Sequence, residues 1–127
     1  MSDSKLRDKS KEFAKRIVYL CRTLKSRNVE SALTNQLLRC GTSVGANVHE
    51  AQYAQGTKDF ISKFEIALKE CNESEYWLEL LHDTNGITNE EFLSFQKECI
   101  NLRRMLVSSV TTLKAKTDTS LKNNSDK

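Results

Sequence analysis

Apolar residues recur along this chain at helical spacing in four successive segments. Within each segment they mostly follow one another at intervals of three, four or seven residues, which places them on one side of an α-helix. The pattern predicts helices over about residues 4–27, 31–55, 57–83 and 88–116. The expected core positions are Leu6, Phe13, Ile17, Leu20, Cys21 and Leu24 in the first segment, Leu33, Leu37, Val44, Val48 and Ala51 in the second, Phe60, Phe64, Ala67, Cys71, Ser74, Leu78 and Leu81 in the third, and Phe92, Phe95, Cys99, Leu102, Leu106, Val110 and Leu113 in the fourth.

Short polar stretches separate the four segments. The first two helices are joined at Asn28–Glu30, and the second and third at Gln55–Gly56. The third connection contains Asn85-Gly86, a pair that readily adopts positive φ in turns. Thr88 and Glu91 then fit a capping box that opens the fourth helix. We therefore predict an all-α fold, an antiparallel up-down-up-down four-helix bundle over residues 1–117, followed by a polar C-terminal tail over residues 118–127.

The second helix carries almost no charge. Between residues 31 and 54 only Arg39 and Glu50 are charged, in a protein of which 29% of the residues are charged. A helix face in contact with water normally carries many Lys and Glu side chains. Gly41 and Gly45 each cost about 1 kcal/mol of helix propensity relative to Ala, which favours the close approach of a neighbouring backbone. We expect another subunit to cover the outer face of this helix; the alternative is that it is simply the central helix of one bundle.

Charge is distributed unevenly, although the net charge is only +3. Residues 1–30 have a net charge of +5, and residues 57–83 have a net charge of −4. The cations of the first helix form a ridge opposite its core positions, and the fourth helix is expected to lie beside it. This basic side is a candidate for binding RNA or DNA, with ordinary solvated surface as the alternative. The candidate nucleic-acid contacts are Arg7, Lys11, Lys15, Arg22 and Lys25 in the first helix and Arg103, Arg104 and Lys114 in the fourth.

Candidate catalytic chemistry is sparse. Glu79 and His82 form one Glu-x-x-His pair, but a di-metal site in a four-helix bundle needs a second such pair and two further glutamates. The sequence implies no His and Asp partners for Ser43, and the four cysteines are expected to be free and reduced in the core. Residues 41–46 lack the Gly-Lys-Ser/Thr ending of a phosphate-binding loop. We expect no enzyme activity, no metal and no cofactor.

No membrane segment is apparent in the sequence. No run approaches the roughly 18 apolar residues needed to cross a bilayer, and the first residues lack the apolar centre of a signal peptide. The sequence therefore predicts a cytoplasmic protein without a membrane partner.

Two segments carry a resemblance to a known family. QLLRCGTSVGANVHEA at residues 36–51 and KDFISKFEIALKECNESEYWLELL at residues 58–81 resemble the four-helix bundle proteins encoded in intervening sequences of bacterial 23S ribosomal RNA genes. The resemblance implies a ring-shaped homopentamer and a distant kinship to accessory proteins of diversity-generating retroelements, which are basic, bind nucleic acid and contact a reverse transcriptase. It does not imply a particular activity. The residues assigned to the family motif and the subunit interface are Gln36, Arg39, Gly41, Ser43, Gly45, Asn47, Glu50 and Trp77.

Two functions are compatible with these observations. The first is a non-enzymatic oligomeric module that binds RNA or DNA non-specifically through the basic side. The second is a protein-interaction scaffold or accessory subunit, for example of a reverse transcriptase, with no direct nucleic-acid contact. Salt-dependent binding to nucleic acid would separate the two.

Overall fold

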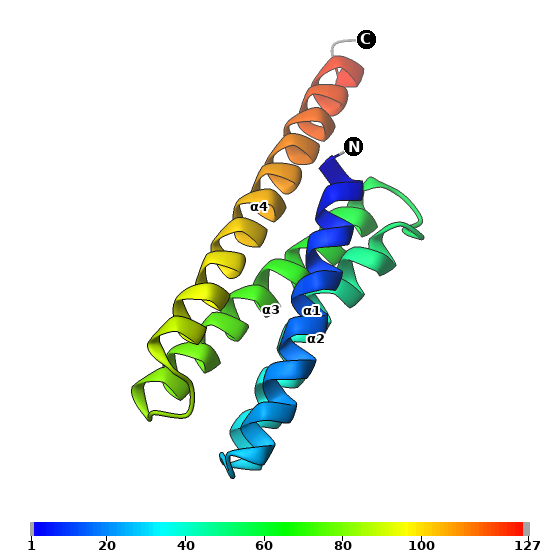
Figure 1. Cartoon of the computed structure of the whole chain (residues 1–127). Coiled ribbons are helices and arrows are strands. Elements are labelled where there is room, and N and C mark those ends of the chain that lie inside the picture. The colour runs from blue at the N-terminus through cyan, green and yellow to red at the C-terminus, as the bar shows by residue number, and fades with distance from the viewer. Residues whose placement is uncertain (1, 126–127) are drawn as a thin grey trace.

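The computed structural model describes the backbone of residues 2–125 and the side chains of residues 4–118. It contains four α-helices, α1 (Ser2–Ser26), α2 (Ser31–Ala51), α3 (Thr57–Asp83) and α4 (Asn89–Ser125), and no strand among the described residues (Figure 1). Helices that follow one another in the sequence pack side by side, and α1 also contacts α4. The start of α1 and the end of α4 lie toward the same end of the molecule (Figure 1). The predicted all-α, four-helix fold is confirmed.

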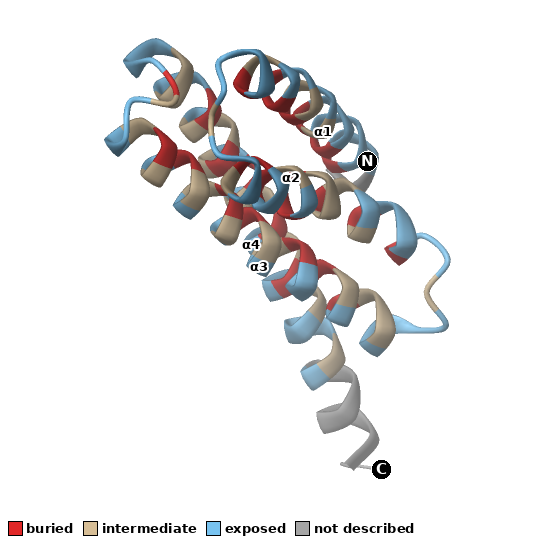
Figure 2. Cartoon of the chain, turned by 90° about the horizontal axis from the view of Figure 1, so that it is seen from below, coloured by how far each residue is buried: buried red, intermediate tan, exposed pale blue. Residues whose placement is uncertain are grey.

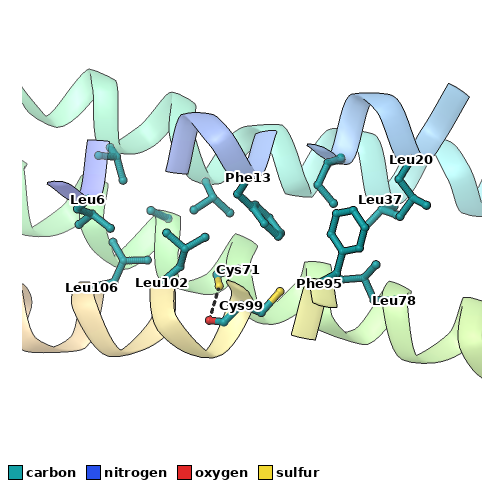
Figure 3. Packing of buried hydrophobic residues seen from close by; sticks show 14 of the residues in the cluster. Leu6, Phe13, Leu20, Leu37, Cys71, Leu78, Phe95, Cys99, Leu102 and Leu106 are labelled. Atoms are coloured by element: carbon teal, nitrogen blue, oxygen red, sulfur yellow. Dashed lines mark hydrogen bonds between the residues drawn. The ribbon is translucent and has the colours of Figure 1, made fainter. Parts of the chain in front are cut away.

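The core lies where the inner sides of the four helices meet. Buried residues form stripes along the sides of the helices that face one another (Figure 2). All six core positions predicted for α1 are buried, and Phe13 meets Phe95 of α4 edge to face, with ring centroids 6.4 Å apart (Figure 3). Four predicted core residues, Leu33, Phe60, Phe92 and Leu113, are only partly buried and pack against the margin of the cluster. Apolar periodicity therefore located nearly the whole core.

The second helix ends earlier than predicted. Its last residue is Ala51, not residue 55. The backbone N–H groups of Gln52, Tyr53 and Ala54 donate to carbonyls three residues before them, so the last turn tightens instead of continuing as an α-helix. The corrected end places Tyr53 in the connection between α2 and α3.

The fourth helix continues further than predicted. It runs to Ser125, whereas the sequence pattern suggested an end near residue 116 and a separate tail over residues 118–127. The segment after residue 116 contains no Gly or Pro to stop a helix. The loss of the apolar stripe therefore did not mark the end of the helix.

The predicted capping box at the start of α4 is confirmed. The backbone N–H of Glu91 donates to Thr88 Oγ1 at 3.0 Å, and the backbone N–H of Thr88 donates to Glu91 Oε1 at 2.8 Å. Asn85 adopts the positive φ of 65° expected for the preceding turn. Local sequence chemistry thus fixes where α3 ends and α4 begins.

Candidate nucleic-acid interface

The predicted cations of α1 lie in one exposed row on the flank of that helix next to α2. We call Arg7, Lys11, Lys15, Arg22 and Lys25 the basic row. All five side chains are exposed. Both ends of the row lie next to α2: Arg7 Nη1 donates to Gln52 Oε1 after the end of α2 at 2.9 Å, and Arg22 and Lys25 line a groove between α1 and the start of α2. The outer surface of the α1–α2 pair is therefore positive along its α1 side.

Most of these cations have no carboxylate partner among the described residues. Only Lys15 is in an ion pair, with Glu12 on the same helix at 3.1 Å. Arg7 contacts neutral oxygens, on Gln52 and Ser4, and the Arg22 guanidinium lies over the Tyr19 ring at 5.5 Å. An exposed cation without a partner retains its charge and its hydrogen-bond donors for an external anion.

Two of the three predicted cations of α4 face elsewhere. Arg103 Nη1 is 2.8 Å from Glu75 Oε1, and Lys114 Nζ is 3.4 Å from Glu65 Oε2, with both carboxylates on α3. The basic side predicted to span the first and fourth helices is therefore wrong. The reason is that Arg103 and Lys114 lie on the flank of α4 that meets the acidic helix α3. Arg104 is exposed, without a carboxylate partner in the described part of the chain.

The contact between α1 and α4 uses a cation that the prediction left out. Arg16 forms an ion pair with Glu98 and donates to Ser94 Oγ at 2.9 Å. Its guanidinium also lies 4.2 Å from the centre of the Phe95 ring. These contacts hold Arg16 against α4, so it is not available to a ligand in the way that the basic row is.

The two glycines of α2 mark a close contact within the subunit. A Cβ at Gly45 would lie 3.1 Å from the carbonyl oxygen of Ser10, and a Cβ at Gly41 would lie 2.9 Å from side-chain carbons of Ile17. The predicted close approach of a neighbouring backbone is therefore confirmed at Gly45. The neighbour is α1 of the same chain, so neither glycine lines an outer face as the interface assignment required.

The other motif residues of α2 line its seam with α3. Arg39 reaches across to α3, with Nη1 3.1 Å from Glu70 Oε2 and Nη2 in contact with Glu73 Oε2. Trp77 Nε1 also donates to Glu73 Oε2 at 3.1 Å. This hydrogen bond, followed by the contact with Arg39, lowers the pKa of Glu73. Arg39 therefore links α2 to two carboxylates of α3, Glu70 and Glu73.

Smaller polar groups of the seam bond to their own helix. Ser43 Oγ donates to the carbonyl of Arg39 at 2.7 Å, and Asn47 Nδ2 donates to the carbonyl of Ser43 at 2.8 Å. Gln36 Oε1 accepts a long hydrogen bond from Arg39 Nε, and Glu50 is exposed. These hydrogen bonds hold the polar side chains of α2 in place along its contact with α3, which is a structural role.

Apolar side chains are exposed beside this seam. Ile66 and Tyr76 of α3 are 39% and 56% exposed. Tyr76 packs edge to face on Trp77, with ring centroids 5.1 Å apart. On the outer face of α2 that the sequence singled out, Ala46 and His49 are exposed. We call Arg39, Ile66, Tyr76 and Trp77 the seam patch.

The cysteines are placed for packing. All four are buried and free. Burial raises the pKa of Cys21 and of Cys40 to about 11, so both remain thiols at neutral pH. Among the described residues, no three His, Cys, Asp or Glu side chains are grouped to hold a metal ion. No described helix is both long enough and apolar enough to span a bilayer.

The sequence model of the 23S rRNA-intervening sequence protein family matches residues 2–108. The chain belongs to this family. The chain is similar to a protein of unknown function from the S23 ribosomal protein family of Bacteroides thetaiotaomicron, whose crystal structure was solved at 1.70 Å resolution. The two sequences are 47% identical. The match covers 87% of this chain and 99% of that one, with a TM-score of 0.85. The comparison with curated proteins found no match.

A groove that the sequence reasoning missed lies beside the basic row. It has a volume of about 840 Å³ and lies between the end of α1 and the start of α2. Its apolar residues include Val18 and Leu38, and Arg22 and Lys25 belong to its rim. The available signal was that Val18 and Leu38 are apolar but lie outside the predicted core stripes of their helices.

Proposed function

We propose that this member of the 23S rRNA-intervening sequence family is a non-enzymatic protein that binds the phosphate backbone of RNA or DNA through the basic row of α1. The observation that carries the proposal is the availability of the row: four of its five cations have no carboxylate partner among the described residues. Lys and Arg side chains that neutralise phosphates gain affinity by releasing counterions. Such contacts carry no base information, so this part of the binding tolerates any sequence.

The distribution of charge within the molecule supports the same surface. The acidic helix α3 neutralises Arg103 and Lys114 of α4, and Glu98 neutralises Arg16 between α1 and α4. The basic row of α1 is left without such neutralisation, apart from the Lys15–Glu12 pair. The exposed residues of α2 on that side include Asn35, Ala46 and His49, none of which carries a carboxylate that would repel a phosphate.

A gel-shift titration at low salt against a mixed set of RNA and DNA tests this proposal. We expect wild-type protein to shift both, and the triple variant Lys11→Glu, Lys15→Glu, Arg22→Glu to shift neither while keeping its helical circular-dichroism spectrum. The matched control is Lys58→Glu, Lys69→Glu, Lys97→Glu, which lowers the net charge by the same amount at exposed sites outside the row. Equal loss in both triple variants, or a shift retained by the first, would contradict a site on α1.

We further propose that the protein acts as a homo-oligomer assembled through the seam patch, as a pentamer if it follows the resemblance to its family. Arg, Tyr and Trp are the residues most often found at the centre of protein interfaces. The two α3 carboxylates hold Arg39 in place, and Tyr76 and Ile66 are exposed beside it. Repetition of the basic row around an assembly would add weak contacts by multivalency.

A protein partner in place of nucleic acid is the second candidate function. The exposed aromatic and aliphatic side chains of the seam patch favour it, because such residues are also typical of contacts between different proteins. A clear failure of nucleic-acid binding, with the seam patch still exposed in a stable subunit, would make this the better interpretation.

A further inference from the structure

We propose that the groove between α1 and α2 accepts an unpaired base, so that the protein binds single-stranded RNA or DNA in preference to duplex. This inference rests on the nucleic-acid binding proposed above and adds the class of substrate. The relevant observation is that the groove and the basic row share two residues, Arg22 and Lys25. A strand whose phosphates follow the row therefore arrives with its sugars and bases beside the mouth of the groove.

The groove has the size and lining of a small-molecule site. Its volume of about 840 Å³ lies within the range of about 300–1,000 Å³ usual for ligand pockets. Val18, Val29 and Leu38 provide half-buried apolar surface against which the face of a base can pack. The buried polar groups of the floor are already satisfied, because the Cys21 thiol donates to the Thr34 carbonyl and Thr34 Oγ1 donates to the Glu30 carbonyl.

The remaining polar groups at the rim match the edges of a base. The side-chain amides of Asn28 and Asn35 make no hydrogen bond to any described residue, and both are exposed. An amide offers two donors and an acceptor, the combination needed to bond a Watson–Crick edge. Glu30 is the one carboxylate at the groove, and a carboxylate accepts hydrogen bonds from exocyclic amino groups such as that of cytosine.

A base can enter this groove only if it is not already stacked and paired. Proteins that bind single strands combine a basic track for the backbone with surfaces on which bases pack. Contacts with phosphates alone predict the opposite preference, because duplex carries the higher charge density. The sign of the preference therefore distinguishes a base in the groove from a purely electrostatic contact.

The test measures the affinity of the protein for three 20-nucleotide probes by fluorescence anisotropy at fixed salt. The probes are a single-stranded RNA, the duplex of the same sequence, and an abasic strand with intact phosphates. We expect the wild-type protein to bind the single strand at least about fivefold more tightly than the abasic strand, the factor that corresponds to about 1 kcal/mol for one base contact. Duplex should also bind more weakly than the single strand.

A substitution that fills the groove supplies the second arm. Asn35→Trp places a large side chain at the rim, and we expect it to lower single-strand affinity to that of the abasic strand. Ala46→Trp is the control, because Ala46 is exposed on the same side of α2 but does not line the groove. It should retain the wild-type preference.

Three results would overturn the inference: equal affinity for single-stranded and abasic probes, tighter binding of duplex, or a preference that survives Asn35→Trp. The absence of binding to all three probes would instead reject the nucleic-acid function itself. The two failures are thus distinguishable in one experiment.

Discussion

At the scale of single residues, glycine inside a helix was the most informative signal in the sequence. Gly45 indicated that a backbone approaches α2 closely, and Ser10 of α1 does so. The sequence could not say which backbone, because a glycine shows only that space is needed. A hint was present in α1 itself, where Ser10 is buried in line with larger apolar residues. A small residue on each of two helices is what close packing between them requires.

Gly45→Leu should therefore destabilise the subunit itself. Its Cβ would lie 3.1 Å from a backbone oxygen that cannot move aside like a side chain, and overpacking of this kind costs about 1–3 kcal/mol. Thermal unfolding followed by circular dichroism measures the effect. Ala46→Leu, at the next and exposed position, should leave the melting temperature within error. A Gly45→Leu protein that melts like the wild type would show that the α1–α2 contact is looser than described.

The pairing of individual cations was less predictable. Arg103 and Lys114 were correctly placed on α4, but their partners Glu75 and Glu65 lie on another helix. Periodicity identifies the side of a helix that faces the core; a residue on the flank is placed only once the neighbouring helix is known. This is why the basic row of α1 could be found from the sequence and the contribution of α4 could not.

At the scale of elements, the helices were predicted well and their connections less so. Local chemistry was sufficient where it was strong, as in the Thr88–Glu91 capping box. It did not reveal that Arg27, after the end of α1, holds the loop between α3 and α4. Arg27 Nη1 and Nη2 lie 2.9 and 3.0 Å from the two oxygens of Glu91, and Nη1 also donates to the Gly86 carbonyl at 3.2 Å. The two helical hairpins are thereby tied together at one end.

This tie predicts a dependence of stability on pH. The hydrogen bond from Arg27 lowers the pKa of Glu91 below its ordinary value of 4.5, so its stabilising effect is fully present above that value and is lost as the pH falls through the folded-state pKa. Glu91→Gln should lower the free energy of unfolding in urea by about 0.5–1 kcal/mol at pH 7, the scale of a partly exposed ion pair. The difference from wild type should shrink in acid.

Glu90→Gln is the control for this measurement, since Glu90 is also in the first turn of α4 and has no ion pair among the described residues. A difference between wild type and Glu91→Gln that stays constant from pH 7 into acid would mean that the ion pair is not its source.

At the scale of the whole molecule, the surface divides into regions with different properties. The basic row and the groove lie along the α1–α2 pair, the seam patch lies along α2 and α3, and α3 carries the negative charge. The sequence predicted the charge imbalance between the first and third helices and the neutrality of the second. It could not predict the groove, because the groove is lined together by α1, the turn at Asn28 and α2, and the pattern of one helix does not show how its neighbour lies against it.

The seam patch predicts self-association. Light scattering after size exclusion should give a mass several times 14.5 kDa. Tyr76→Lys should lower that mass, because it places a charge at the centre of the proposed contact. Leu93→Lys is the control, since Leu93 is similarly exposed on α4 outside the patch. A monomer at micromolar concentration, or an assembly whose mass Tyr76→Lys does not change, would show that the seam patch does not mediate self-association.

The central claim is that the cations of the basic row are free to neutralise phosphates, and the salt dependence of binding counts them directly. Affinity for a duplex should be measured by fluorescence anisotropy between 50 and 300 mM salt. If the four cations without carboxylate partners each neutralise one phosphate, the plot of log affinity against log salt should fall with a slope of about −3 to −4 for each bound subunit.

The triple variant Lys11→Glu, Lys15→Glu, Arg22→Glu should show no measurable salt-dependent binding, while Lys58→Glu, Lys69→Glu, Lys97→Glu keeps the wild-type slope. A slope near zero, or a steep slope that the first triple variant retains, would contradict the account.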